Sequence, residues 1–363
     1  MIRTVTQRTL TPLQKVFVRT LAIILAIISS MLIMLCLKLN PFTVYAKLIV
    51  GSLGSAYRFR ETVNKAIPLT MLSLGTCIAF KMKFWNIGAE GQFYMGAFGA
   101  TWMVFLFPTL PKALLLILMA ISAFVFAALY ALIPATLKIK WGTSETLVTL
   151  MLNYVAQKWV GYLQYGPWRD PAGNGFPRIA RFSQNAILPK VFGIHIGWII
   201  TLVIAVLLFY MIRRTKFGYE ISVIGESRET ARYAGINVNL TVILAIALSG
   251  GICGLAGMMQ ASAIENSLTD NMSNGLGFTS VITTWLSALN PLVMVFVSFL
   301  FSMLLQGGSF LQSSMQIPAS MAEILQGIII FFVLGSEFFV RYKFVMVKKA
   351  KSDSRVTEEG KKC

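Results

Sequence analysis

Residues 86–92, NIGAEGQ, place one carboxylate, two amides and two glycines between the apolar runs PLTMLSLGTCIAF (68–80) and FYMGAFGATWMVFLF (93–107). An ionisable side chain at membrane depth is costly, so Glu90 is expected to face protein or water rather than lipid. The glycines loosen a helix or let another backbone approach. Two interpretations follow: polar groups at an interrupted helix of a transport path, or a short loop at the membrane surface.

Composition identifies the class of protein. The chain has 363 residues, of which 56% are hydrophobic and 13% charged, and its mean hydropathy is +0.71. A soluble domain carries about a quarter charged residues, so this is an all-α, polytopic integral membrane protein in contact with lipid. The net charge of +18 does not indicate nucleic acid, because Lys and Arg cluster in short runs between apolar segments, as the positive-inside rule expects.

Several sequence signatures of enzymes are absent. The four cysteines have no metal-site or disulfide spacing, and the single histidine, His195, reads as a polar residue near a helix start. The sequence contains neither a P-loop nor HExxH or GxSxG. We therefore expect no catalytic residues, no metal site and no cofactor bound by this chain.

A spanning helix needs about 20 apolar residues, and the sequence predicts about ten such segments. They are roughly 18–39, 63–80, 87–107, 112–137, 144–165, 196–212, 240–262, 276–289, 291–307 and 321–341, of which the eighth and ninth could form one re-entrant element. Most basic residues fall in segments on one side of this arrangement, which places both termini in the cytoplasm.

This topology divides the chain into three parts. Residues 1–17 form a cytoplasmic N-terminal segment, 18–341 a membrane domain, and 342–363 a disordered basic tail. The membrane domain includes a basic cytoplasmic loop at about 213–239. Within it, 226–234 predicts a short helix that ends at Gly235, which serves either as a docking helix or as a connecting loop.

Polar side chains also recur within apolar segments. Glu145, Thr149, Asn153 and Gln157 are four residues apart, so they line a slowly winding stripe on one helix. Such a stripe either lines a path or joins helices by hydrogen bonds. Phe278 and Trp285 follow an acidic segment at 263–274 and either face a ligand or pack internally. The glycines of SGGICGLAGMMQ (249–260) predict close helix packing.

Five segments together resemble a known family of transport proteins. They are FWNIGAEGQFYMGAFGA (84–100), SETLVTLMLNY (144–154), FGYEISVIGESRETARYAGINV (217–238), GLGFTSVITTWLSALNP (275–291) and MQIPASMAEILQGIIIFFVL (315–334). In this order they are similar to permease subunits of bacterial ABC importers for simple sugars and nucleosides. They look most like nucleoside importers served by lipoproteins of the basic membrane protein type. TWLSALNP departs from the Ala-Leu-Leu-Gly stretch common in the family.

The resemblance implies an assembly and a location. A multi-pass chain in the bacterial cytoplasmic (inner) membrane would pair with a second permease, usually a different chain. Two ATPase subunits would hydrolyse ATP, and an extracellular or periplasmic lipoprotein would deliver substrate. The residues matching the family's ATPase-coupling pattern are Gly225, Glu226, Arg232, Tyr233, Gly235 and Asn237.

The predicted function is transport of a nucleoside or related ribose-containing solute. Aromatic faces with a few amide or carboxyl partners suit such a solute. The candidate path residues are Asn86, Glu90, Gln92, Glu145, Asn153, Phe278 and Trp285. A simple-sugar ABC permease is one alternative. A stand-alone secondary transporter, with ion coupling at Glu90 and Glu145, is another.

Overall fold

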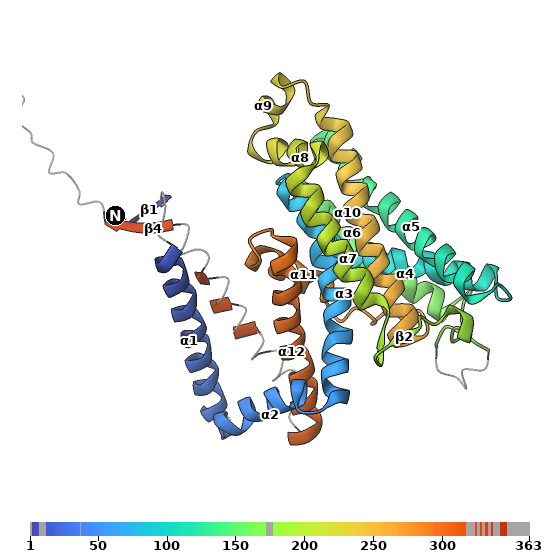
Figure 1. Cartoon of the computed structure of the whole chain (residues 1–363), viewed down its shortest axis with the longest axis horizontal. Coiled ribbons are helices and arrows are strands. Elements are labelled where there is room, and N and C mark those ends of the chain that lie inside the picture. Colours follow the sequence, from blue (N-terminus) through green and yellow to red (C-terminus); the bar gives the residue numbers. More distant parts are fainter. Residues whose placement is uncertain are drawn as a thin grey trace, which may run out of the picture. The chain divides into compact units, whose positions relative to one another are not determined.

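The structure is a computed structural model that describes residues 2–6, 12–36, 38–171, 177–316 and 342–346, and a few helical positions between 324 and 336. The chain divides into two compact units, Met1–Lys38 with Gly327–Cys363, and Leu39–Gln326 (Figure 1). Each unit is described by itself.

The first unit contains one long helix and a two-stranded sheet. Helix α1 (Pro12–Cys36) corresponds to the first predicted span and begins earlier than predicted, with proline at a position that suits its fixed φ. Strand β1 (Ile2–Thr6) pairs antiparallel with β4 (Tyr342–Met346), which lies in the tail predicted as disordered. Residues 347–363 and most of the helix predicted at 321–341 lie outside the described residues.

The second unit is a helical bundle (Figure 1). Its α-helices are α2 (Pro41–Leu53), α3 (Ala56–Lys81), α4 (Ala89–Leu106), α5 (Lys112–Trp141), α6 (Glu145–Tyr165), α7 (Gly197–Arg214), α8 (Lys216–Glu226), α9 (Arg228–Tyr233), α10 (Val238–Gln260), α11 (Leu276–Leu286) and α12 (Pro291–Met315). Shorter elements are η1 (Gln184–Ala186), the π-helical turn η2 (Ala261–Glu265), and the hairpin of β2 (Lys190–Val191) with β3 (Ile194–His195).

Five described helices are individually long and apolar enough to cross a membrane: α3, α5, α7, α10 with η2, and α12. Helices α4 and α6 have spanning length but carry the polar residues noted in the sequence. Helix α11 has 11 residues and is therefore only about 16 Å long, too short to cross a bilayer of about 30 Å. Length and hydropathy of the described helices thus support a multi-pass membrane protein, and the count of about ten spans stays a prediction.

The centre of the bundle is formed by α3, α4 and α10, with α5 packed over α4 and α10. Glycines permit the close crossing of α4 and α10, as the sequence predicted. A Cβ on Gly257 would overlap the carbonyl of Phe93, and one on Gly96 would overlap the backbone of Gly254. Backbones this close exclude any larger side chain.

The two ends of the bundle carry different elements. Helices α8 and α9 lie at one end, while α2 and the β2–β3 hairpin lie toward the other (Figure 1). The short helix predicted at 226–234 is confirmed as α9. It is followed by Gly235 at φ +75°. Helices α2 and α8 were not predicted.

Candidate functional site

The most unusual feature of the bundle is the break between α10 and α11. Helix α10 ends in the π-helical turn η2, and Asn266 then adopts φ +53°. Asn274 and Gly275, just before α11, also have positive φ, of +46° and +77°. The backbone between η2 and α11 is therefore irregular.

Side chains from neighbouring helices satisfy this irregular backbone. The Asp270 carbonyl accepts hydrogen bonds from the Tyr94 hydroxyl at 2.6 Å and from Nε2 of Gln157 at 3.2 Å. The Asp270 N–H donates to Oε1 of Gln164 at 3.1 Å. Non-helical backbone at membrane depth is tolerated where protein supplies these partners. The segment is thus held against α4 and α6 by these side chains.

Glu90 binds the start of α11. Its Oε2 accepts a hydrogen bond from the Gly277 N–H at 2.7 Å, and its Oε1 is bonded to the Ser273 hydroxyl. Gly275, the N-cap residue of α11, has no side chain to cap the helix, so the carboxylate of another helix takes that role. A Cβ on Gly277 would lie 2.5 Å from Glu90 N and Oε2, which explains the glycine.

Asn153 caps α4 in a similar way. Its Oδ1 accepts from the Gly91 N–H at 2.8 Å, while its Nδ2 donates to the Ile87 carbonyl at 2.9 Å. The N-cap residue of α4 is Gly88, again without a side chain. Helix α6 therefore caps α4, and α4 caps α11, through two buried polar side chains. This trans-capping series, Asn153 to α4 and Glu90 to α11, links three helices.

Asn86 and Gln92 form a second buried network beside this series. Oδ1 of Asn86 accepts from Nε2 of Gln92 at 3.1 Å and from the Gly88 N–H at 3.0 Å. Nδ2 of Asn86 lies 3.4 Å from Oγ of Ser249, which donates to the Gly75 carbonyl at 2.7 Å. The loop before α4 is thereby joined to α10 and α3.

Helix α11 presents an accessible side as well as a buried one. On the buried side, hydroxyl pairs join it to α3: Ser73 to Thr283 at 2.5 Å and Thr76 to Thr284 at 2.7 Å.

On the accessible side of α11, Phe278 is 38% exposed, and the Trp285 ring stacks on Trp85 with centroids 5.5 Å apart. Asn271 and Asn274, just before the helix, are exposed. Two amides and several aromatic rings are thus available to a ligand.

The candidate path residues fall into three groups. Asn86, Glu90, Gln92 and Asn153 come together around the start of α4, where each is buried and bonded within the chain. Phe278 and Trp285 lie on α11. Glu145 lies two helical turns from Asn153, so its carboxylate is not part of the group around the start of α4. It is bonded to Lys138 instead.

Sequence reasoning missed several residues of this region. Ser273 and Gly277, the partners of Glu90, lie 183 and 187 residues further along the chain, so no local pattern connects them with it. Asn271 and Asn274 could have been found, because they are amides immediately before an apolar run.

The segment predicted to couple to an ATPase forms two consecutive helices. Helix α8 packs against the end of α3, where a Cβ on Gly225 would overlap the Lys81 carbonyl. Oγ of Ser227 caps α9, and Oδ1 of Asn237 caps α10. Tyr233 is 94% exposed. The coupling candidates Glu226, Arg232 and Gly235 are also exposed, so α9 offers a projecting, open surface.

Comparison with known proteins identifies the family. Residues 59–334 match the model of a family described as the permease component of the branched-chain amino acid transport system. The chain therefore belongs to this family of membrane permeases and is a permease component of an ABC transporter. The predicted class, a transport subunit, is confirmed.

Three relatives extend the match over nearly the whole chain. A glucose ABC transporter permease, TsgB13 of Haloferax volcanii, is 31% identical over 85% of this chain and 84% of its own. The nucleoside ABC transporter permease NupB of Lactococcus lactis is 28% identical over 96% and 99%. The guanosine ABC transporter permease NupP of Bacillus subtilis is 27% identical over 93% and 98%.

Proposed function

We propose that this chain forms the translocation path of an ATP-driven, binding-protein-dependent importer for a nucleoside or related ribose-containing solute. The main support is the match to NupB, which covers nearly all of both chains. A simple sugar is the second candidate, because the relative named for glucose is 31% identical. Both solutes are polyols, and a nucleoside adds an aromatic base.

The observation that supports a solute path beside α11 is the break in regular structure before this helix. Discontinuous helices are where many transporters bind their substrates. The accessible side of α11 offers the Phe278 ring, and the loop before it offers the amides of Asn271 and Asn274. Aromatic faces suit a base, and amides suit ribose hydroxyls. We assign Phe278 and Trp285 to the wall of the path.

The buried polar residues have a supporting role in this proposal. Glu90 and Asn153 cap α11 and α4, and Asn86 and Gln92 join the same region to α10. These four residues hold the wall of the proposed path in place. Glu145, paired with Lys138, belongs to the end of the bundle nearer α9.

We propose the rest of the assembly with reference to the open surfaces of the chain. A second permease, a different chain, would face α11 and close the path. Two ATPases would dock on α8 and α9 at the cytoplasmic side, and a lipoprotein would deliver solute at the opposite end. This arrangement places both termini in the cytoplasm of a bacterial cell and supposes about ten crossings of its cytoplasmic membrane.

The identity of the transporter can be tested by its partners. The tagged chain would be purified from native membranes in a mild detergent, and its partners identified by mass spectrometry. We expect an ATPase, a second permease and a lipoprotein, and we expect the lipoprotein to bind nucleosides more tightly than glucose. Recovery of the chain alone across several detergents would contradict the importer, and preference for glucose would favour the second candidate.

The path assignment has its own test. Phe278→Ala and Trp285→Ala should each raise the KM for uptake about tenfold, since each removes an aromatic face from the solute. Assembly with the partners should be unchanged. Phe296→Ala is the control, because Phe296 is 63% exposed on α12. Equal effects of the three variants on KM would remove α11 from the path.

A further inference from the structure

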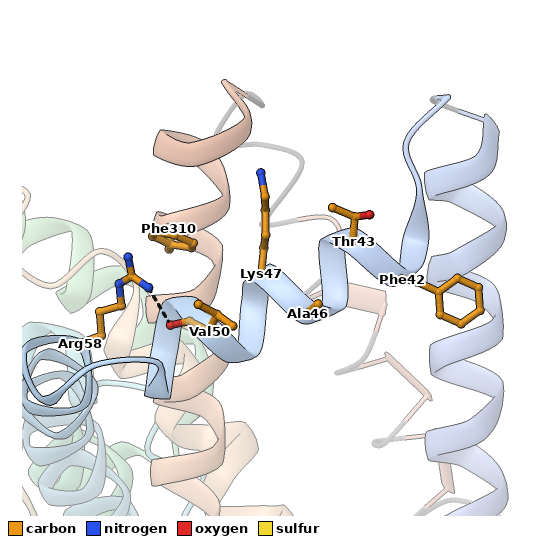
Figure 2. A pocket seen from close by; sticks show the side chains of 7 residues that line it. All are labelled: Phe42, Thr43, Ala46, Lys47, Val50, Arg58 and Phe310. Carbon is orange, nitrogen blue, oxygen red and sulfur yellow. Dashed lines mark hydrogen bonds between the residues drawn. The ribbon is translucent and has the colours of Figure 1, made fainter.

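A groove lies between α2, the start of α3 and the end of α12. Figure 2 shows its lining side chains, which come from all three helices. It has a volume of about 600 Å³. Its walls include Phe42, Lys47, Val50, Arg58 and Phe310. The proposed solute path uses none of these residues, so the groove needs an explanation of its own.

Close helix packing builds the walls of this groove. Helix α2 crosses α12 at two glycines: a Cβ on Gly51 would lie 2.5 Å from Cβ of Phe310, and one on Gly307 would lie 2.6 Å from the Leu48 carbonyl oxygen. The Thr62 hydroxyl of α3 also donates to the Ser52 carbonyl of α2 at 2.8 Å. These contacts fix the groove's shape.

Two basic side chains line the groove. The guanidinium of Arg58 lies 4.1 Å from the centroid of the Phe310 ring and donates one hydrogen bond, to the Val50 carbonyl at 3.1 Å. Nζ of Lys47 lies 3.5 Å from the Ser314 carbonyl. Among the described residues, no carboxylate forms a salt bridge with Lys47 or Arg58. Within the described part of the chain, no carboxylate therefore compensates the positive charge of the groove.

Apart from Thr43, the exposed residues of α2 are apolar. Phe42, Ile49 and Val50 are 74%, 55% and 47% exposed. Apolar surface of this extent is unfavourable in water, whereas in a membrane permease it faces acyl chains. The occupant of the groove must therefore satisfy both an apolar wall and two cations.

We propose that this groove binds an anionic phospholipid. Its phosphate lies between Lys47 and Arg58, and an acyl chain lies along Phe42, Ala46 and Val50. An Arg guanidinium presents a planar fork of donors that matches phosphate geometry. Basic pockets between helices are typical of sites for anionic head groups. The lipid joins α2 to α3 and α12 at the end of the bundle remote from α9.

Native mass spectrometry of the full-length chain in a mild detergent tests this site. Phosphatidylglycerol and phosphatidylcholine would be titrated onto the wild type and onto the double variant Lys47→Gln, Arg58→Gln. We expect the wild type to favour phosphatidylglycerol. Each charge near a membrane surface contributes about fivefold in affinity, so the double variant should lose roughly 25-fold. The affinity for phosphatidylcholine should not change.

Arg213→Gln is the matched control. Arg213 lies 4.5 Å from the Phe209 ring centroid, so it forms the same kind of cation–aromatic pair outside the groove. An equal loss of phosphatidylglycerol in this control, or no loss in the double variant, would overturn the proposal. So would complete competition by millimolar inorganic phosphate, which would indicate an anion site without a lipid.

The single variant Lys47→Gln is the control for an effect on folding. The Lys47 side chain has one weak hydrogen bond and is partly exposed, so its loss leaves the packing intact. An unchanged melting temperature with about fivefold weaker phosphatidylglycerol binding supports the site. Unchanged binding in this variant contradicts it, whatever the behaviour of the double variant.

Discussion

Glu90 is the residue whose structural role is most sharply defined by its contacts. Its carboxylate accepts from the Gly277 N–H at 2.7 Å and bonds to Ser273, while only 7% of the residue is exposed. Glu90→Ala leaves the Gly277 N–H and the Ser273 hydroxyl buried without their acceptor. Each unsatisfied donor costs about 1–3 kcal/mol. We expect a lower melting temperature in detergent and impaired uptake.

Two variants separate this role from a simple loss of charge. Glu90→Gln keeps one acceptor for Gly277, so its melting temperature should fall less than that of Glu90→Ala, while uptake is impaired and partners still assemble. Glu229→Ala removes an exposed carboxylate on α9 and should leave the melting temperature unchanged. If Glu90→Ala melts like the wild type, Glu90 does not hold α11.

We expect His195 to make the stability of the chain depend on pH. The side chain is 2% exposed in the β2–β3 hairpin, and neither ring nitrogen has a hydrogen-bond partner among the described residues. Burial, with a smaller contribution from the positive charge of Lys190, lowers the pKa of His195 to about 4. The neutral imidazole is therefore the form that fits the folded protein.

The sign of the pH effect follows from this lowered pKa. An unfolded histidine has a pKa of about 6.5, so between pH 6.5 and 4 the unfolded chain binds the extra proton. The contribution of His195 to the free energy of unfolding is fully present above pH 6.5. It falls by about 3 kcal/mol as the pH drops to 4. His195→Leu should have a melting temperature that decreases less between pH 7.5 and 4.5. Parallel decreases in both proteins would refute this assignment.

At the scale of the elements, the α4–α10 crossing should be the least tolerant of added volume. Gly257→Ala would force its methyl group into the Phe93 carbonyl, and Ala97 N lies only 3.0 Å from the same point. Both obstacles are backbone atoms, so the helices must separate. Overpacking of this kind costs about 1–3 kcal/mol. The melting temperature and the yield of folded protein measure it.

Gly161→Ala is the control for this prediction. Gly161 also lies in a helix, α6, but the nearest atom to its added Cβ would be 3.9 Å away. Alanine should be neutral there or stabilise the helix by about 0.5–1 kcal/mol. A Gly257→Ala protein as stable as Gly161→Ala would show that the two helices cross less closely than the structure indicates.

The elements also show how far a sequence alone can predict this fold. Helix α9 was predictable because its stop signal, Gly235, is local. Helix α2 begins with an equally local signal, the Asn40 cap before Pro41, but lies outside the long apolar runs on which span prediction depends. The predicted segment 276–289 ends early, as α11, because Ala288 and Leu289 adopt positive φ. No local pattern indicates that ending.

In the candidate site, too, local sequence signals were predictable and contacts between distant residues were not. Sequence reasoning found Glu90 and Asn153, because polar residues in apolar runs are conspicuous. It left open whether Asn153 lines a path or joins helices, and the hydrogen bonds to Gly91 and Ile87 show the joining contact. Contacts between residues far apart in the chain depend on tertiary packing, so Ser273 was not found.

At the scale of the whole molecule, packed helices connect the exposed α9 with the proposed path. Helix α9 has few contacts of its own, but α8 is held against the end of α3 at Gly225. Helix α3 is bonded in turn to α11 through Ser73 and Thr76. A movement of α8 and α9 therefore has a continuous route of packed helices to the proposed path. Double variants at both ends would be needed to measure such coupling.

Tyr233 tests the start of that route. It is 94% exposed, so Tyr233→Ala should leave the melting temperature of the isolated chain unchanged. Buried aromatic anchors at protein interfaces are typically worth 2 kcal/mol or more, so affinity for the ATPase subunits should fall about 30-fold or more. Co-purification at graded salt and solute-stimulated ATP hydrolysis would measure the loss.

The control for Tyr233 is Tyr210→Ala, since Tyr210 is 60% exposed on α7, away from α9. It should retain both the ATPase subunits and solute-stimulated hydrolysis. If Tyr233→Ala binds the ATPases normally but uncouples hydrolysis from uptake, α9 transmits movement without supplying affinity. If both variants behave as wild type, the ATPases dock elsewhere. The exposure of α9 would then have to serve another partner, because an open aromatic side chain at a helix end contributes little to the fold of the chain itself.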